Sequence, residues 1–516
     1  MGSVLTGALV AAAAVLFAIG SNAGTGDLTL GRLASIVTRS DQGDDGKGPN
    51  GGPRAGVSAA DRPGDGPGAR DTTEGRPEGE DAQEKGSGDH AWRHGPDGDH
   101  DGKHDGDHDG QHDDDHPDHG AIKVPCDPDK LIAALVRANA EGGATLRLAA
   151  GCTYLLGAYD EHRDRHENHD GRRPWGDDGD DAERSGLPQI RKPIRIQGEG
   201  ATIVRPAGVE RFRFFTVRDG GRLRLSDVTL KNGREADGGG IKVEFGGIAV
   251  IERTEITQSV ADSPHGGGGA IFNEGRLTVI ESRLTDNSAA GVAGRGGGIL
   301  NHGLLALRKS ELSNNSANGY GGGLANHRAS ADVSHSEISH NTAAEGGGIA
   351  SHSSRTKVWD STVSRNTARS GGGIATREGT LAVHQTKVSD NIGFDNGGGI
   401  ATAEGLAAVD DSLVGTNTTF GNGGGVAARR ADLIVRGTRI VRNAASGPDS
   451  VGGGIALDVG KLVLSRSTVT GNEAVKEPGG IFATQVRSEV DDETVIIGNR
   501  PTNCEGGPTE IPNCFG

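Results

Sequence analysis

Residues 371–400 read GGGIATREGTLAVHQTKVSDNIGFDNGGGI, and this stretch decides the fold. It begins and ends with three glycines followed by isoleucine, and this phrase or a close relative of it occurs ten times between residues 238 and 484. The intervals between its aliphatic residues are 30, 28, 25, 25, 25, 26, 26, 29 and 26 residues. A period of this size indicates a solenoid, in which each unit buries its apolar face only against its neighbours. The aliphatic residues are Ile241, Ile271, Ile299, Leu324, Ile349, Ile374, Ile400, Val426, Ile455 and Ile481.

The inside of one unit alternates at strand spacing. In the unit quoted above, Ile374 and Thr376 are expected to point inward, as are Leu381 and Val383, and Val388 follows after another bend. Strands of three to five residues separated by turn residues leave no room for a helix. Successive coils must then pair in parallel, about 4.8 Å apart, with the right-handed crossover that parallel connections take. The sequence therefore predicts an all-β fold, a single-stranded right-handed parallel β-helix with three short strands per coil and about twelve coils, whose Gly-triplet repeats cover residues 238–499.

An asparagine closes the third strand of nearly every unit. Most of these asparagines end the phrase Ser/Thr-x-aliphatic-x-x-Asn, as in residues 361–366. Stacked one per coil, their amides would hydrogen-bond up and down a ladder inside the bend. The glycine triplets allow positive φ and let the backbones of neighbouring coils approach without a Cβ between them. The predicted ladder consists of Asn287, Asn315, Asn341, Asn366, Asn391, Asn417, Asn443, Asn472 and Asn499.

The β-helix body is expected to cover residues 121–516 and to begin with a cap. Asp127-Pro128 places an N-cap residue before a proline suited to the first helical position. Apolar residues then repeat at helical spacing from Leu131 to Val136. We predict a capping helix over residues 127–141, which would prevent a bare sheet end from pairing with another molecule.

A charged insertion is predicted over residues 158–187, which are rich in Asp, Arg and His. After it, apolar residues alternate from Ile190 to Val228 at strand spacing. These residues are expected to form the first two coils, before the glycine signature begins.

The four cysteines favour an oxidising compartment. Cys126 and Cys152 flank the predicted helix and the strand after it, and Cys504 and Cys514 lie in a C-terminal loop over residues 500–516. Four cysteines allow three pairings. The two local pairings, Cys126 with Cys152 and Cys504 with Cys514, lose the least chain entropy, because each closes a short loop at one end of the body.

The first residues are typical of an exported protein. Residues 4–19 are apolar and carry no charge, but the run is short for a membrane span, which needs about 20 residues. The small residues of Ser21-Asn22-Ala23 predict that residues 1–23 are a signal peptide, cleaved before Gly24. No Lys or Arg precedes the run, so the alternative is a cell-surface protein anchored in the membrane through residues 4–19.

Residues 24–120 form an acidic arm rich in Gly, Asp and Pro. The arm carries 23 acidic and 10 basic residues, whereas residues 121–516 carry 48 acidic and 44 basic ones. A segment so poor in aliphatic side chains cannot bury enough surface to offset its chain entropy, so we expect it to be a disordered linker. A nearly neutral body on an acidic arm argues against a nucleic-acid partner, which requires a basic surface.

Five histidines recur at every fourth position among the aspartates of this arm. Imidazole and carboxylate groups at this density would bind Zn²⁺, Ni²⁺ or Cu²⁺ weakly. The intervening glycines work against a preformed site, and a hydrated spacer is the simpler interpretation. The histidines are His100, His104, His108, His112 and His116.

The repeat resembles a known group of proteins. The phrase Ser-x-Val-Ser-x-Asn-x-Ala followed by Gly-Gly-Gly-Ile, the entry segment from Cys126 to Cys152 and the ending Asn503-Cys504…Cys514 look like actinobacterial secreted right-handed parallel β-helix proteins of the pectin-lyase-like superfamily. Residues 268–272, GGAIF, are also similar to the repeat of chlamydial polymorphic outer-membrane proteins. The resemblance covers residues 121–516 and implies a β-helix; many members of the group have no assigned reaction, so it implies little about activity.

The superfamily includes pectate lyases, polygalacturonases, methylesterases and adhesive spikes, which makes catalysis the alternative to binding. A hydrolase would need two carboxylates within several ångströms of each other, and a lyase would need an acidic Ca²⁺ site beside an Arg or Lys base. The sequence contains no Gly-His-Gly motif. Asp410-Asp411 and Arg355-Thr356-Lys357 are the nearest candidates, but they stand at different offsets in the repeat, and a solvated turn is the simpler interpretation of the aspartates.

One column of residues is a candidate surface site. Three positions after the signature aliphatic residue, strand alternation predicts an outward-facing column in which three histidines stack on consecutive coils. The column would suit a metal ion, an anionic sugar or acid/base chemistry, although duplication of units would also produce it. Imidazoles about 5 Å apart disfavour being charged together, so the pKa of each is expected to fall. The column consists of Glu274, His302, His327, His352 and Arg377.

These observations favour a secreted or cell-envelope rod that acts as an extracellular binding or adhesion element, with a polysaccharide or a surface molecule as its partner. Polar side-chain ladders on a rigid sheet suit such a partner. A polysaccharide lyase or glycoside hydrolase is the alternative function. We expect a monomer, and Ca²⁺ only if the protein is a lyase.

Overall fold

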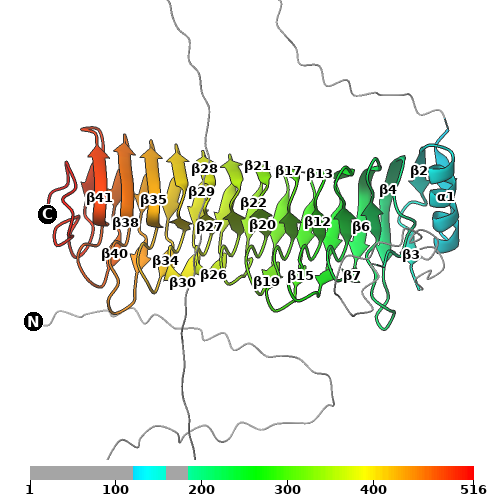
Figure 1. Cartoon of the computed structure of the whole chain (residues 1–516), viewed down its shortest axis with the longest axis horizontal. Helices are drawn as coiled ribbons and strands as arrows, with labels where there is room; N and C mark the ends of the chain where they lie inside the picture. Colours follow the sequence, from blue (N-terminus) through cyan, green and yellow to red (C-terminus); the bar gives the residue numbers. More distant parts are fainter. Residues whose placement is uncertain (1–119, 158–183) are drawn as a thin grey trace, which may run out of the picture. The chain divides into compact units, whose positions relative to one another are not determined.

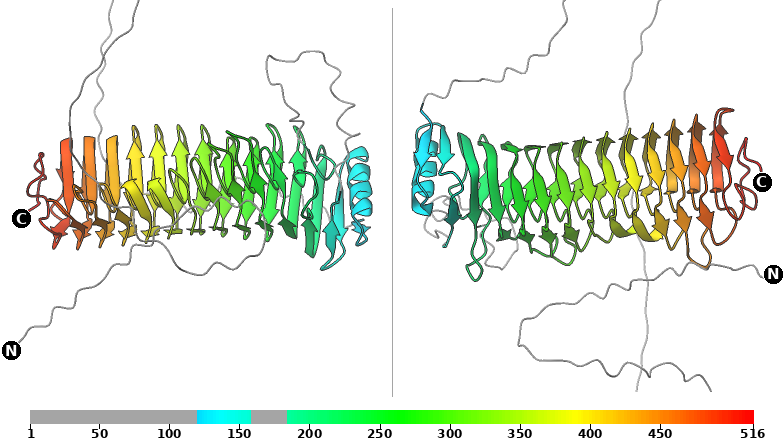
Figure 2. Two further views of the ribbon diagram at one scale, coloured as in Figure 1. Left: turned by 90° about the horizontal axis from the view of Figure 1, so that it is seen from below. Right: turned by 180° about the vertical axis from the view of Figure 1, so that it is seen from behind.

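The computed structural model describes residues 120–157 and 184–516, and nearly all of them belong to one stack of parallel strands (Figure 1, Figure 2). The prediction of a parallel β-helix is confirmed, with about thirteen turns where about twelve were expected. In the quoted unit, β27 (Ile374–Arg377), β28 (Thr380–His384) and β29 (Lys387–Ser389) each pair in register with their counterparts one coil later. Those counterparts are β31 (Ile400–Ala403), β32 (Leu406–Asp410) and β33 (Leu413–Gly415).

Four columns of strands run along the stack. The first, beginning at the glycine triplets, contains β5 (Phe215–Val217), β8 (Ile241–Val243), β12 (Ile271–Asn273), β16 (Ile299–Asn301), β20 (Leu324–His327), β23 (Ile349–His352), β27 and β31. The second contains β1 (Ile122–Val124), β2 (Ala144–Leu148), β9 (Ile248–Glu252), β13 (Arg276–Ile280), β17 (Leu304–Arg308), β21 (Ser330–Ser334), β24 (Arg355–Trp359), β28 and β32. The third contains β3 (Thr153–Leu155), β10 (Glu255–Thr257), β14 (Arg283–Thr285), β18 (Glu311–Ser313), β22 (Glu337–Ser339), β25 (Thr362–Ser364), β29, β33, β36 (Arg439–Val441), β39 (Thr468–Thr470) and β42 (Val495–Ile497).

Five longer strands each cover two columns. β4 (Pro193–Val204) and β6 (Arg222–Lys231) run through the second and third columns, and β35 (Val426–Arg436), β38 (Ile455–Ser465) and β41 (Ile481–Val490) through the first and second.

A fourth column of very short strands, which the prediction of three strands per coil did not include, occupies the corner before each glycine triplet. The corner forms strands because a small residue, such as Ala289, Ala317 or Ala368, points inward and is buried there. This column contains β7 (Arg234–Glu235), β11 (Val260–Ala261), β15 (Ser288–Ala289), β19 (Ser316–Ala317), β26 (Thr367–Ser370), β30 (Ile392–Asn396), β34 (Thr418–Thr419), β37 (Ala444–Ala445) and β40 (Glu473–Ala474).

Each glycine of a triplet has its own reason to be glycine. Gly371 has a φ of +62°, which side chains other than glycine's rarely accept. A Cβ on Gly372 would lie 2.4 Å from the carbonyl oxygen of Ile392, and a Cβ on Gly373 would lie 2.9 Å from Nδ2 of Asn391. The triplet therefore forms a tight corner against the asparagines of the bend.

The asparagines stack inside that bend as a hydrogen-bonded ladder. Asn391 donates from Nδ2 to the carbonyl oxygen of Val363 (2.9 Å) and to Oδ1 of Asn417 (2.9 Å). Its own Oδ1 accepts hydrogen bonds from the backbone N–H and the Nδ2 of Asn366, both at 3.0 Å. The same pattern recurs from Asn287 to Asn499, and all nine side chains are buried.

A second ladder, of hydroxyl groups, runs through the preceding bend. The backbone N–H of Ser361 donates to Oγ1 of Thr386, that of Thr386 to Oγ of Ser412, and that of Ser412 to Oγ1 of Thr438. The chain of contacts extends from Thr254 to Thr494. Its signal was present in the sequence, because the Ser or Thr that opens the phrase ending in the ladder asparagine supplies the hydroxyl.

Both ends of the stack are covered. The expected capping helix is α1 (Pro128–Ala140); Oδ1 of its N-cap residue Asp127 accepts the N–H of Asp129 at 2.9 Å, and Leu131 and Leu135 are fully buried. The disulfides have the local pairing, Cys126 with Cys152 and Cys504 with Cys514. At the C-terminal end Ile511 is 4% exposed and closes the core.

Several expectations fall on residues that the structure does not describe. They are the signal peptide or anchor (1–23), nearly all of the arm, including His100, His104, His108, His112 and His116, and residues 158–183 of the charged insertion. Residues 184–187 belong to the body: Ser185 bridges to Arg213, and Leu187 is buried. Within the described ranges no helix is long and apolar enough to cross a membrane.

Candidate functional site

The outward-facing side chains of the first strands form a floor of small residues. Strand alternation sends the residue after each signature aliphatic outward, and Ala375, Ala401, Ala427 and Ala456 occupy this position on four consecutive coils. Two positions further along, Arg377, Ala403, Arg429 and Asp458 stack beside the floor as one wall.

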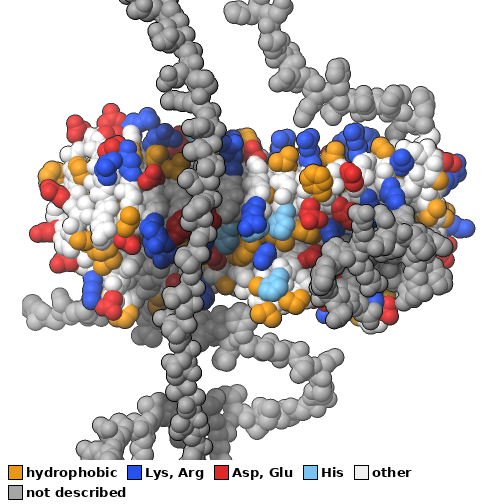
Figure 3. Space-filling view, in the orientation of Figure 1, with side chains coloured by type: hydrophobic (Ala, Val, Ile, Leu, Met, Phe, Trp, Pro, Cys, Tyr) orange, Lys and Arg blue, Asp and Glu red, His pale blue; other side chains and the backbone are white. Residues whose placement is uncertain are grey.

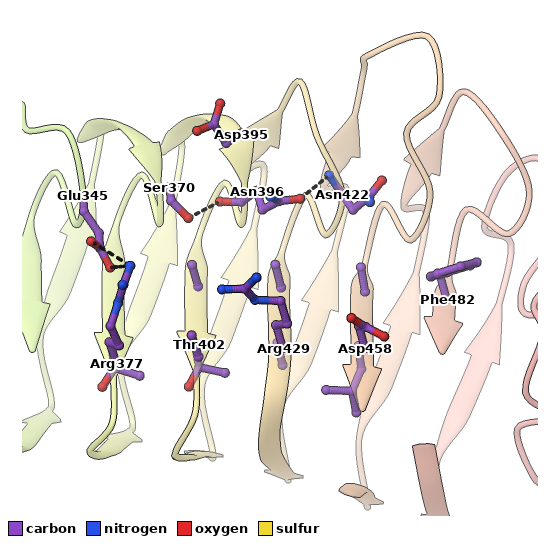
Figure 4. Close-up of a pocket in the computed structure, with 17 residues that line it drawn as sticks. Glu345, Ser370, Arg377, Asp395, Asn396, Thr402, Asn422, Arg429, Asp458 and Phe482 are labelled. Atoms are coloured by element: carbon purple, nitrogen blue, oxygen red, sulfur yellow. Dashed lines mark hydrogen bonds and ion pairs between the residues drawn. The ribbon is translucent and has the colours of Figure 1, made fainter. Parts of the chain in front are cut away.

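The opposite wall comes from the residue immediately before each glycine triplet. Tyr320, Glu345, Ser370, Asn396 and Asn422 stand in this position and are joined from coil to coil as a parallel ladder. The triplet turns the chain sharply between this ladder and the first strand, so two outward-facing columns meet across a corner. The space between them is a groove of about 440 Å³ that runs along the stack (Figure 4).

Bulky side chains bound the alanine floor at both ends. Phe482 stands in the floor position one coil after Ala456 and also lines the groove (Figure 4). Towards the N-terminus the floor positions become Leu300 and Phe272, which are buried against Ala325 and Tyr320. The open groove therefore extends over only part of the stack.

The three candidate histidines do stack on consecutive coils, at the N-terminal end of this groove. His327 pairs with His352 in the ladder of first strands, and the His302 ring lies 5.3 Å from the His327 ring. His302 also meets the ring of Phe272 edge-on at 5.2 Å. The column faces outward, but these side chains are half-buried because the opposite wall covers them. Glu274 stands one coil before His302 in the same column.

Burial and like charges depress the histidine pKa values. Burial, followed by the charge of His327, lowers the pKa of His302 from 6.5 to about 4. The pKa of His327 is also lowered, mainly by burial and then by Arg295 and Arg328. At neutral pH His302 and His327 are therefore neutral imidazoles.

Tyr320 on the opposite wall contacts two of these histidines. Its hydroxyl lies 3.1 Å from Nδ1 of His327, and its ring packs 4.2 Å from the ring of His352. The guanidinium of Arg295 lies over the tyrosine ring, 5.4 Å from its centre. Burial raises the pKa of Tyr320, so the phenol remains protonated at neutral pH.

Glu345 links the histidine column to the arginine column. One of its carboxylate oxygens lies 3.2 Å from Nε2 of His352, and the other lies 3.4 Å from a guanidinium nitrogen of Arg377. Burial would raise the pKa of Glu345, but His352 and Arg377 outweigh this and hold it below its usual value. The carboxylate is therefore charged and occupied within the protein.

Arg429 is the wall residue best placed to meet a ligand. It is exposed, and it forms no ion pair with the residues that the structure describes. Figure 4 shows its guanidinium turned away from Asp458 and lying over the coil of Thr402. Across the groove, Oδ1 of Asn396 accepts the N–H of Asn422, and Oδ1 of Asn422 accepts that of Val451, which leaves both Nδ2 groups as donors.

Of the residues that line this groove, the sequence candidates included only Arg377; Arg429 and the whole opposite wall were missed. Glu345, Tyr320, Asn396 and Asn422 were not candidates because they stand outside the strands that the apolar pattern defines. The one signal they carry is position: each immediately precedes a glycine triplet, where the residue type changes from coil to coil.

The other sequence candidates do not form a site. Asp410 makes two 2.7 Å contacts with Arg436 one coil later, so its charge is compensated. Asp411 lies in the following turn, and Arg355 and Lys357 stand in other columns of the second strands. No group of three or more His, Cys, Asp or Glu side chains that could hold a metal ion occurs among residues 120–157 and 184–516.

Comparisons with known proteins find only distant structural similarity. No family model matches the chain, and no curated protein matches it. Among solved structures, the A-module of Azotobacter vinelandii mannuronan C-5 epimerase AlgE6 matches at 15% identity and a TM-score of 0.34, over 72% of this chain and 97% of that one. A mutant tailspike protein of E. coli bacteriophage HK620 in complex with a pentasaccharide matches at 15% identity and a TM-score of 0.37, over 72% and 63%. Similarity at this distance carries no inference about the function of this chain.

The groove is suited to binding an extended polar chain. Its rigid walls are columns with one residue per coil, so it offers a new set of side chains about every 4.8 Å. Glu345 and Asp458 do not form a hydrolytic pair, because they stand four coils apart, or about 19 Å, well beyond the roughly 5–10 Å that glycoside hydrolysis uses. The third carboxylate that lines the groove, Asp395, forms an ion pair with Arg369 at 2.9 Å.

Proposed function

We propose that this protein is an extracellular or cell-envelope binding element that holds an unbranched, acidic polysaccharide in the groove over Ala375–Ala456. The observation that carries this proposal is Arg429, an exposed guanidinium without an ionic partner among the described residues, above a floor of alanines and opposite two amide donors. A carboxylate or sulfate group is the natural partner of such a guanidinium. The coil spacing of about 4.8 Å is close to the length of one pyranose unit in an extended chain.

The two disulfides and the apolar N-terminal run support the location. Disulfides persist in oxidising compartments, so we infer export, with cleavage before Gly24 or retention through residues 4–19 as the two alternatives. Mass spectrometry of the N-terminal peptide of the mature protein distinguishes them. An adhesive role would follow if the bound polysaccharide belongs to a cell surface.

Binding is tested with a panel of acidic and neutral oligosaccharides of increasing length, measured by calorimetry. Affinity should increase with length until the groove is filled, at about four units, and then level off. Replacing Arg429 with Ala should weaken binding of acidic chains about 10- to 100-fold, the usual size of a hydrogen bond to a charged group. Arg439→Ala, an exposed arginine on β36 outside the groove, is the matched control.

A second pair of variants distinguishes binding in the groove from binding elsewhere on the surface. Ala427→Trp fills the floor and should abolish binding, whereas Ala408→Trp, which faces outward on β32, should leave it unchanged. Binding that survives both Arg429→Ala and Ala427→Trp would place the ligand elsewhere and refute the proposal.

A lyase is the second candidate function, and one observation favours it. Tyr320 and His327 form an acid/base pair at 3.1 Å, and the guanidinium of Arg295, 5.4 Å from the centre of the tyrosine ring, could neutralise a substrate carboxylate. If the protein cleaves uronate chains, absorbance from unsaturated products should appear, and Tyr320→Phe should remove it while oligosaccharides still bind. Saturable binding without products supports the binding role.

A further inference from the structure

A cluster of arginines lies on the outer face of the first coils, far from the groove. Arg195 on β4, Arg222 and Arg224 on β6 and Arg276 on β13 occupy outward positions of the second strands, and we call them the N-terminal basic face. Arg195 pairs with Arg224 in the ladder, and Arg222 and Arg276 flank β9 in a single column. Figure 3 shows Lys and Arg side chains gathered along the upper edge of these coils.

The positive charge of this face is only partly compensated. Arg224 pairs with Glu252 at 2.9 Å. Arg195, Arg222 and Arg276 form no ion pair with any residue in the described part of the chain. Like charges on neighbouring strands repel each other, so a counter-charge on this face would stabilise it.

The chain enters the body at this same face. Gly120, the first described residue, lines a groove of about 800 Å³ together with Arg195, Arg222 and Arg224. Directly before it, residues 109–119 read DGQHDDDHPDH, with five aspartates and no Lys or Arg. Eleven extended residues reach about 37 Å, whereas the face spans three coil steps, or about 14 Å.

We propose that residues 109–119 dock on the N-terminal basic face, with their aspartates as counter-charges for Arg195, Arg222 and Arg276. The short connection gives these aspartates a high effective concentration at the face, so weak individual contacts suffice. A polyanion from outside would then have to compete with these aspartates for the arginines of the face. This inference is independent of the groove and of any ligand bound there.

Cleavage by endoproteinase Asp-N, which cuts before aspartate, tests the docking in the full-length protein. Arg222→Glu/Arg276→Glu should speed cleavage between residues 113 and 118 about three- to tenfold at low salt, as expected for the loss and reversal of exposed ion pairs. The matched control is Arg365→Glu/Arg439→Glu, two exposed arginines without ionic partners in the described residues, and it should leave the rate unchanged. About 0.5 M salt should remove the difference between the two double variants. Arg222→Gln/Arg276→Gln, which introduces no new charge, should give a smaller change of the same sign.

Retention on a heparin column tests the contribution of the aspartates in residues 109–119. Asp113→Asn/Asp114→Asn/Asp115→Asn should uncover the face and delay elution more than Asp41→Asn/Asp44→Asn/Asp45→Asn, which removes the same charge far from residue 120. Equal cleavage rates of Arg222→Glu/Arg276→Glu and Arg365→Glu/Arg439→Glu would overturn the proposal. So would equal elution of the two aspartate variants, and strong heparin binding by the unchanged protein would assign the face to an external polyanion.

Discussion

Acidification is expected to destabilise the body through His302. In the folded protein, burial and the neighbouring His327 lower the pKa of His302 to about 4, whereas in the unfolded chain the ring titrates near 6.5. Between these values the unfolded state binds the additional proton, so the free energy of unfolding falls as the pH falls through this window. At pH values well above 6.5 the ring is neutral in both states and the effect is absent.

The magnitude follows from the size of the shift. A difference of about 2.5 pKa units corresponds to about 3.4 kcal/mol at full protonation, and to about 2.4 kcal/mol between about pH 7 and about pH 4.5. The ring is only partly buried, so water screens some of this energy, and we expect a loss of about 1 kcal/mol from His302 alone.

The assay is urea denaturation followed by circular dichroism at both pH values. His302→Gln removes the titrating ring and should reduce the loss of stability at low pH by about 1 kcal/mol relative to the unchanged protein. His265→Gln is the control, because His265 is exposed in the loop before a glycine triplet. If His302→Gln and His265→Gln lose the same stability on acidification, the histidine column is not held as a buried neutral stack and the reasoning fails.

The remaining predictions concern the interior and the C-terminal end. Asn391→Ala removes the four hydrogen bonds of this side chain and leaves the buried backbone N–H of Asn366 without its acceptor, so it should cost about 3–5 kcal/mol in urea denaturation. Asn318→Ala, at an exposed asparagine, should cost less than about 0.5 kcal/mol, and similar losses would show that the ladder does not stabilise the bend. Cys504→Ser/Cys514→Ser opens a short loop, with a cost of about 3 kcal/mol in the chain-entropy model, and should raise hydrogen exchange in β41 and β42 while leaving β27 protected, because a repeat array frays from its ends. Uniform exchange along the stack would contradict this.

The sequence predicted the parts of the fold that stacking imposes on every coil. Gly371–Gly373 and Asn391 recur because an added Cβ would meet backbone or amide atoms of the next coil, and because each amide needs an identical neighbour. Such constraints act at one residue per coil, so they appear as a period in a single sequence. The capping helix was predictable for a different reason: Asp127-Pro128 and the helical spacing after it are local signals.

The groove could not be predicted in the same way. It depends on which side chains face each other across a corner between different strands: Tyr320 and His327 are seven residues apart, and the turn at Gly321–Gly323 lies between them. Glu345 and Arg377 are separated by more than a full coil. The distance between the two columns across the corner could not be estimated from the sequence, because the fourth strands that determine it are only two to five residues long.

The groove lies where the outward-facing residues of the first strands depart from the repeat, although the signature residues that face inward keep it. The signature position, which faces inward, remains aliphatic through all ten triplets, because a smaller residue there would leave a cavity in the core. The floor position is free of that constraint, and it changes from Phe272 and Leu300 to a run of alanines and then to Phe482. Small residues on an outward column do not improve the stacking of coils, but they leave space for a ligand above the sheet. A run of them bounded by large side chains, with Arg429 on one wall and amides on the other, is therefore better explained by a ligand than by the stability of the β-helix.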